Sequence, residues 1–177
     1  FQTCNVIGLD DATLVAGPPT MLEGRVGDLR LADSVIVDEA GAKGKLAKPG
    51  PTPDSPKIPL KVGDILELND NRAVVVGIAR TTRTFQSQPV VYTTYSRAMR
   101  FAPRERRLLS FILAKVREGE DIDVVRQRIN QQADLAAYTA PQFKSLTIRY
   151  FMRSTGIPIN FGMAVGLGFL VGVAIVG

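Results

Sequence analysis

The chain of 177 residues lacks histidine and tryptophan and contains a single cysteine, Cys4. Without histidine, a Ser-His-Asp triad, a Cys-His dyad and a histidine-ligated metal site are all excluded. One cysteine allows neither a disulfide within the chain nor a zinc site built from several thiolates. No GxSxG motif and no phosphate-binding P-loop occurs either. We therefore expect no catalytic residue, no cofactor and no metal site.

Charge of either sign is missing from the C-terminal end. Arg153 is the last charged residue, and the 24 residues 154–177 are mostly apolar or glycine. About 20 apolar residues are needed to cross the hydrocarbon core of a bilayer. Residues 157–177 therefore predict a transmembrane helix, with a buried helix of a soluble protein as the alternative. Because no polar flank follows Gly177 and the chain does not begin with Met, we expect a fragment cut inside or at the end of this helix.

Four glycines punctuate the predicted span in two small-xxx-small patterns. They are Gly162, Gly166, Gly168 and Gly172. Such patterns let another helix approach closely in lipid, where packing drives association. We expect them to mark helix packing in the membrane, and the alternative is that glycine is simply common in membrane helices.

The residues before the span predict a domain of mixed α and β structure over residues 1–153. Hydrophobic residues make up 45% of the chain and charged residues 22%, which is close to a globular average. Alternating and β-branched runs predict strands at 35–37, 65–68, 72–79, 88–95 and 108–116, with a turn at 69–71. Helical patterns follow at 38–46, from residue 118 onwards and at 141–153.

The junction between helix 141–153 and the predicted span contains two helix-breaking residues, Gly156 and Pro158. They either separate the two helices or introduce a kink between them. We call them the coupling joint, because a movement of the span has to pass through them to reach the preceding domain.

Two basic segments have no assigned chemistry. Residues 49–59 hold five prolines and residues 43–61 five lysines, which predicts a solvated loop rather than a docking loop. Residues 97–107 hold five arginines, for which a solvated loop is expected and a contact with anionic lipid or an acidic partner is the alternative. The net charge of +5 is small and aromatic residues are few, so nucleic-acid binding is not expected.

The acidic groups are not expected to form a site. Asp10 and Asp11 are adjacent and therefore point apart on a helix or a strand, so they make a poor acid/base pair. The acidic residues between 118 and 123 lack the order of a calcium-binding loop. Helix capping explains this second cluster better.

Seven short segments occur in an order that is informative as a whole. They are residues 5–9 (NVIGL), 21–25 (MLEGR), 33–39 (DSVIVDE), 62–64 (VGD), 74–78 (VVVGI), 115–121 (KVREGED) and 154–158 (STGIP). With the apolar run after them, these segments resemble the extracytoplasmic domain and second membrane helix of ABC transporter permeases of the MacB/FtsX type, in particular the DevC-like exporter branch. The Pro/Lys-rich segment 43–61 departs from the family pattern.

This resemblance implies an α+β fold, with a mixed-sheet extracytoplasmic domain in two lobes followed by a transmembrane α-helix. It implies four membrane helices in the whole protein, with the large domain between the first and the second. It also implies an ATP-binding ABC subunit, a periplasmic adaptor protein and a homodimer. The implied location is the bacterial inner membrane, with the soluble domain in the periplasm.

The sequence is therefore interpreted as the permease subunit of an ABC exporter. Its periplasmic domain is expected to couple ATP-driven movement of the membrane helices to the adaptor and to export, while ATP hydrolysis occurs on a separate subunit. A membrane-anchored sensory or adaptor-binding module without transport activity is the alternative. Arg149 and Arg153 precede the span and on their own suggest a cytoplasmic side, but the positive-inside rule does not govern large translocated domains.

Overall fold

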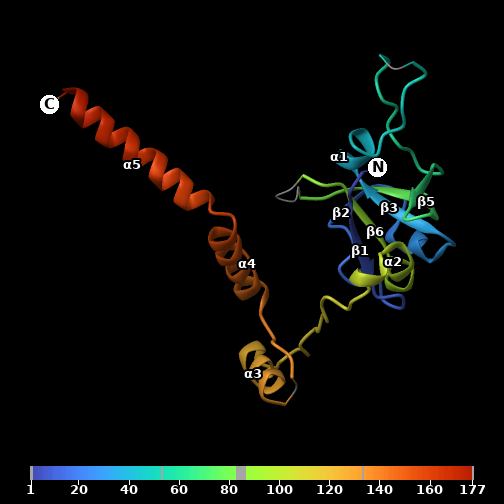
Figure 1. The fold of residues 1–177 in the computed structure, drawn as a ribbon. Coiled ribbons are helices and arrows are strands. Elements are labelled where there is room, and N and C mark those ends of the chain that lie inside the picture. Colours follow the sequence, from blue (N-terminus) through green and yellow to red (C-terminus); the bar gives the residue numbers. More distant parts are fainter. Residues whose placement is uncertain (1, 53, 83–86, 133, 177) are drawn as a thin grey trace. The chain divides into compact units, whose positions relative to one another are not determined.

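The computed structural model describes residues 2–52, 54–82, 87–132 and 134–176 (Figure 1). The chain divides into two compact units, Phe1–Leu113 and Ala114–Gly177. The first unit contains the sheet, and the second contains the long helices. This division follows packing, so the boundary between domain and membrane helix predicted at residue 153 stays a prediction.

The first unit is built on a sheet that has six strands within the described residues. They are β1 (Asn5–Leu9), β2 (Thr20–Glu23), β3 (Ser34–Asp38), β4 (Ile65–Leu68), β5 (Asn71–Arg80) and β6 (Val90–Thr94). Their order is β1-β6-β3-β5-β2, and β4 also pairs with β5. The β1–β6 and β3–β5 pairs are parallel, whereas β2–β5, β3–β6 and β4–β5 are antiparallel. The predicted mixed sheet and α+β class are thus confirmed.

The β4–β5 hairpin forms where the sequence predicted it, because its turn residues determine the geometry locally. Asn69 and Asp70 both have positive φ, at 49° and 61°, and Leu68 pairs with Asn71 across the turn. A two-residue connection with two positive φ angles matches the right-handed twist of the flanking strands, and asparagine and aspartate tolerate it.

The core lies on both sides of the central strand β3, all five residues of which are buried. Val35 and Val37 belong to one apolar cluster, together with Val75 and Phe101. Ile36 belongs to a second cluster. Since successive side chains of a strand point to opposite faces, β3 contributes to two cores at once. The continuous apolar run at 35–37 is therefore confirmed as a fully buried strand.

Short helices connect these strands. They are the 3-10 helices η1 (Val26–Arg30) and η2 (Arg104–Arg106) and the α-helices α1 (Glu39–Lys43) and α2 (Tyr95–Phe101). Helix α1 begins after its N-cap Asp38, as predicted, but ends at Lys43 instead of residue 46. The prediction of a solvated loop at 97–107 is wrong for residues 97–101, which belong to α2, and for residues 104–106, which form η2. Phe101 is buried in the core.

The strand predicted at 108–116 is also wrong, because these residues have neither helix nor strand structure. Leu108, Phe111 and Ile112 expose between 66% and 72% of their side-chain surface. A preference for β structure becomes a strand only when another strand supplies hydrogen bonds and a packing surface. Within the described residues, this run has no such partner.

Apart from Lys43, which ends α1, the described residues of the Pro/Lys-rich loop form no helix and no strand, as predicted. Lys48 and Ile58 form an isolated antiparallel bridge, and Lys48 also pairs with Asp64. Leu60, at the end of the loop, is buried in the core and its amide donates to the Ala42 carbonyl. The loop is therefore anchored where it leaves and rejoins the sheet unit. Pro53 lies outside the described residues.

The second unit consists of α3 (Ile122–Gln132), α4 (Ala140–Ser154) and α5 (Ile157–Val176). Asp121 accepts the Asp123 amide at 2.7 Å and so caps α3, as the sequence suggested. Thr139 and Gln142 form a reciprocal capping box at the start of α4, where Pro141 lies in the first turn. Helices α3 and α4 thus begin at local capping signals, which are visible in the sequence.

No single helix within the described residues is both long and apolar enough to cross a bilayer. Helix α4 and residues Ile159–Ile175 meet the length and hydropathy requirement together, as a pair bent by 56°. The transmembrane helix at 157–177 therefore stays a prediction.

Candidate functional site

The residues singled out by the sequence lie in α5 and at the start of it. Helix α5 carries no charged residue, and its described side chains are exposed, with Leu167 at 63% and Phe169 at 71%. An exposed apolar surface of this extent is unfavourable in water. The helix therefore requires a bilayer or another apolar surface around it.

The four glycines of α5 face open space. A Cβ added at Gly162, Gly166, Gly168 or Gly172 would have no atom within 4 Å. A helix turns by about 100° per residue, which places Gly162 and Gly166 on one stripe and Gly168 and Gly172 on another, roughly 120° away. The sequence reasoning identified the pattern but missed that it makes two stripes. Their role in helix packing stays a prediction.

The coupling joint is a break between two helices, centred on Gly156. The Thr155 amide donates to the Phe151 carbonyl at 3.0 Å, which ends α4, and the Asn160 amide donates to the Gly156 carbonyl at 2.9 Å. Gly156 has φ of +63°, a left-handed conformation that favours glycine. Pro158 lies in the first turn of α5, where a missing amide hydrogen costs little. The helices are separated by two residues and bent by 56° at this break. The role of Gly156 and Pro158 as a coupling joint stays a prediction.

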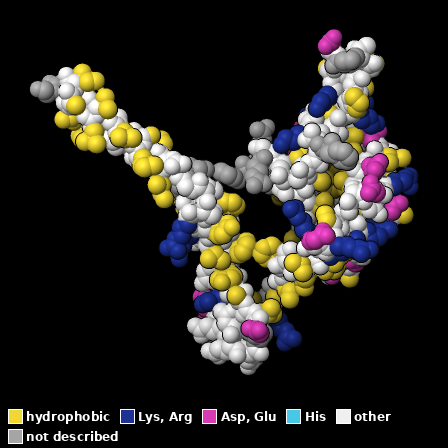
Figure 2. All heavy atoms as spheres, in the orientation of Figure 1, with side chains coloured by type: hydrophobic (Ala, Val, Ile, Leu, Met, Phe, Trp, Pro, Cys, Tyr) yellow, Lys and Arg dark blue, Asp and Glu magenta, His cyan; other side chains and the backbone are white. Residues whose placement is uncertain are grey.

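Helix α4 is amphipathic, and its apolar stripe is exposed. Phe143, Leu146 and Tyr150 lie along it and are exposed by 41%, 42% and 65%. Three cationic side chains, Lys144, Arg149 and Arg153, occur on the same helix. Figure 2 shows basic side chains on one side of this helical segment and apolar side chains on another.

Arg97 lies in a partly buried polar network, which the sequence reasoning missed. Its guanidinium donates to the Leu29 carbonyl at 2.7 Å and to Ser34 Oγ at 2.7 Å. Thr93 Oγ1 in turn donates to the Ser34 carbonyl at 2.9 Å. Burial, followed by the nearby Arg100, lowers the pKa of Arg97. The network connects η1, β3, β6 and α2, so Arg97 holds the sheet unit together.

Asp11 has a comparable structural role at the start of α2. Its carboxylate accepts the Ser96 amide at 3.1 Å and Ser96 Oγ at 2.5 Å. Burial acts to raise the pKa of Asp11, but the hydrogen bonds from Ser96, together with Thr94 and the charge of Arg97, outweigh it and the pKa is lowered. Asp10 instead accepts from Thr13, within its own turn. The two neighbouring carboxylates thus accept hydrogen bonds from different segments.

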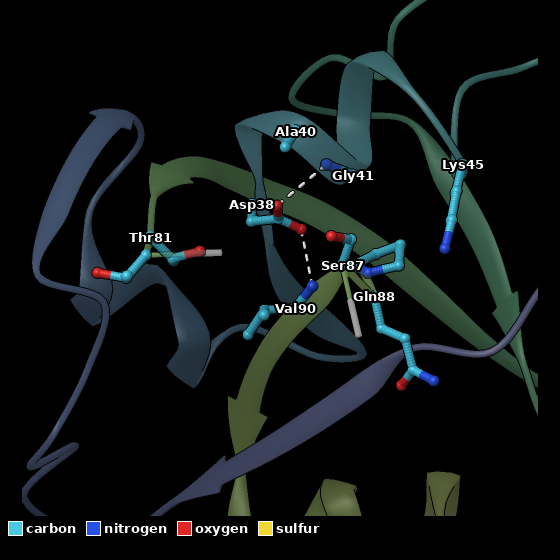
Figure 3. Close-up of a pocket in the computed structure, with 10 residues that line it drawn as sticks. Asp38, Ala40, Gly41, Lys45, Thr81, Ser87, Gln88 and Val90 are labelled. Carbon is cyan, nitrogen blue, oxygen red and sulfur yellow. Dashed lines mark hydrogen bonds between the residues drawn. The ribbon is translucent and has the colours of Figure 1, made fainter. Parts of the chain in front are cut away.

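A small pocket of about 190 Å³ lies beside α1 (Figure 3). Asp38, Gly41, Lys45, Gln88 and Val90 are among its lining residues. One carboxylate oxygen of Asp38 accepts the Gly41 amide at 3.0 Å, and the other accepts the Val90 amide at 2.7 Å. Asp38 therefore connects α1 to β6 and is occupied by structural hydrogen bonds.

The remaining candidates for chemistry are few. Burial raises the pKa of the Cys4 thiol, which disfavours the reactive thiolate. In the described part of the chain, no three Cys, Asp or Glu side chains lie close enough together to hold a metal ion.

The family model of the MacB-like periplasmic core domain matches residues 2–132. This range covers the sheet unit and α3, and it ends before α4 and α5. No curated protein and no solved structure matches the chain at the significance level that we required.

Proposed function

The chain belongs to the MacB-like periplasmic core domain family, and we propose from this premise that it couples movement of membrane helices to a periplasmic adaptor protein during export. Its function is of the ABC transporter permease type, in an inner-membrane protein with a periplasmic domain. It is a transporter component. In the proposal, a separate ATP-binding subunit hydrolyses ATP and the permease works as a homodimer.

The observation that supports this proposal is the direct succession of the matched domain, α4, the joint and α5. The family match ends at residue 132 and α4 begins at Ala140. Only Thr155 and Gly156 separate α4 from α5. In the proposal, residues 157–177 span the membrane, so a displacement of that span reaches the domain through this short connection.

The geometry of the joint suits transmission of movement. Hydrogen bonds on both sides of Gly156 fix the neighbouring residues, so few backbone torsions are free to absorb a displacement. A long glycine-rich linker behaves as a flexible coil and would absorb it. We therefore propose that Gly156 and Pro158 set the direction in which α4 continues from the membrane span, and that the length of the joint matters.

A glycine insertion tests this proposal. Gly-Gly-Gly placed after Thr155 of the full permease, together with its ATP-binding subunit and adaptor, is expected to abolish most export. Basal ATP hydrolysis and the fold of the sheet unit are expected to persist, because neither depends on the joint. The same insertion after Asp54, in the Pro/Lys-rich loop, is the matched control and is expected to leave export intact.

The outcome that contradicts the proposal is export at the normal rate by the Thr155 insertion variant with its domain folded. The segment would then be a passive tether. A membrane-anchored sensory or adaptor-binding module would become the better interpretation if the whole protein also exported nothing.

A further inference from the structure

The charge on α4 and α5 is of one sign only. Lys144, Arg149 and Arg153 are the charged residues between Leu135 and the C-terminal end, and no acidic residue occurs there. Within the described residues, none of the three forms an ion pair with another part of the chain. The three cations therefore have no anionic partner in the described part of the chain.

Two of these cations share one face of α4. Arg149 and Arg153 are four residues apart, which places their Cβ atoms about 6 Å from each other on a helix. At about 100° per residue, they lie beside the apolar stripe of Phe143, Leu146 and Tyr150. Lys144 lies on the other side of that stripe and farther from α5. A pair of guanidinium groups at this spacing can bind one phosphate group together, since each presents a planar fork of donors.

The position of the pair along the chain indicates which anion it meets. Arg153 is followed by 24 uncharged residues that include α5. When α5 lies in the bilayer, the residues just before it lie at the level of the lipid headgroups. An apolar stripe next to cationic side chains is also the pattern of helices that lie at a membrane surface. An acidic protein would satisfy the charge, but it would leave the apolar stripe beside the membrane unexplained.

We propose that Arg149 and Arg153 bind the phosphate groups of anionic phospholipids, while Phe143, Leu146 and Tyr150 contact the acyl region next to them. The proposal rests on the membrane position of residues 157–177 given under the proposed function. Binding at this point fixes the depth of the joint in the bilayer, because Gly156 follows Arg153 by three residues.

The test uses the full chain in vesicles of phosphatidylcholine mixed with phosphatidylglycerol. After extraction in mild detergent, the ratio of the two lipids that copurify is measured by mass spectrometry. The wild-type chain is expected to retain phosphatidylglycerol preferentially. Arg149→Gln with Arg153→Gln is expected to lower this preference by about fivefold for each charge removed.

Arg104→Gln with Arg106→Gln is the matched control, because it removes the same charge from η2 in the sheet unit. It is expected to keep the wild-type lipid ratio. An equal loss in both double variants, or no preference in the wild type, would overturn the proposal.

Alkaline carbonate treatment of the same vesicles separates this failure from a failure of the proposed function. A chain that stays in the membrane without lipid preference overturns only the headgroup site. A chain that is released by carbonate overturns the membrane position and the headgroup site with it.

Discussion

The two compact units differ in the burial of their apolar side chains. In the sheet unit, all residues of β3 and β6 are buried, and the core continues on both sides of the sheet. In α3 and α4 no residue is buried, and the described side chains of α5 are exposed. The sheet unit is thus stabilised by its own packing. The helices, in contrast, have exposed apolar surfaces that are stable only against lipid or another apolar surface.

The largest expected effect is a cavity in the sheet unit. Ile36 is completely buried, and Ile36→Ala is expected to lower the free energy of unfolding by about 2–5 kcal/mol. Ile148, on α4, is 53% exposed, and Ile148→Ala is expected to change the free energy of unfolding by less than about 0.5 kcal/mol. Urea unfolding of the full chain in mild detergent, monitored by hydrogen exchange of the sheet amides, measures both. Equal losses would mean that the two units do not differ as described.

A charge in α5 distinguishes exposure to water from exposure to lipid. Leu167→Arg is harmless if the helix is in water, but near the middle of a bilayer it costs about 2.5–3.5 kcal/mol. We expect the variant to shift the full chain from the membrane pellet to the supernatant after alkaline carbonate treatment. Leu108→Arg is the matched control, because Leu108 is even more exposed and lies in the sheet unit. Release of the wild-type chain by carbonate would contradict the predicted span.

Much of the contrast between the sheet unit and the helices could be predicted from the sequence, because the patterns that indicate it involve residues close together in the chain. The Asn69 and Asp70 turn, the buried run at 35–37 and the capping box at Thr139 each depend on residues a few positions apart. The uncharged C-terminal run was visible in the same way. The glycine pattern and the joint are visible in the sequence in the same way, and their roles stay predictions. The two-stripe arrangement follows from the helical geometry.

The rest depends on contacts between residues far apart in the chain. Arg97 reaches Ser34 and Leu29, which are 63 and 68 positions away, and no local pattern reports such a partner. The run 108–116 has the composition of a strand, but pairing is decided by what lies beside it. The partners proposed above belong to other chains, and a contact with another chain leaves no clear local signal in this one.

The glycine stripes of α5 give a smaller and more specific effect. Gly168→Leu and Gly172→Leu are expected to weaken association between helices in the membrane, since a bulky side chain prevents close approach. Val171→Leu lies off both stripes and is expected to have little effect. A membrane dimerisation assay compares the three variants. If all three behave alike, the glycines only reflect the composition of the helix.

The smallest expected effect is a pH dependence of the free energy of unfolding, and it is confined to the sheet unit. The hydrogen bonds from Ser96 hold the pKa of Asp11 below its ordinary value, so the folded state binds a proton less readily than the unfolded state. The lowered pKa of Asp11 therefore contributes to the stability of the folded state. This stabilisation is complete above the ordinary aspartate pKa of about 4 and is lost as the pH falls through the lowered pKa. Because Asp11 is exposed, we expect less than about 1 kcal/mol.

Asp11→Asn is expected to reduce the acid-induced loss of stability of the sheet, measured by urea unfolding between pH 6 and about pH 3. Asp54→Asn, in the Pro/Lys-rich loop, is the matched control for the change in charge. The rate of hydrogen exchange of the α5 amides is expected to be the same in both variants, because α5 carries no ionisable side chain. A change in α5 as large as that in the sheet would show that the two units unfold together, and the contrast between them would then not extend to their stability.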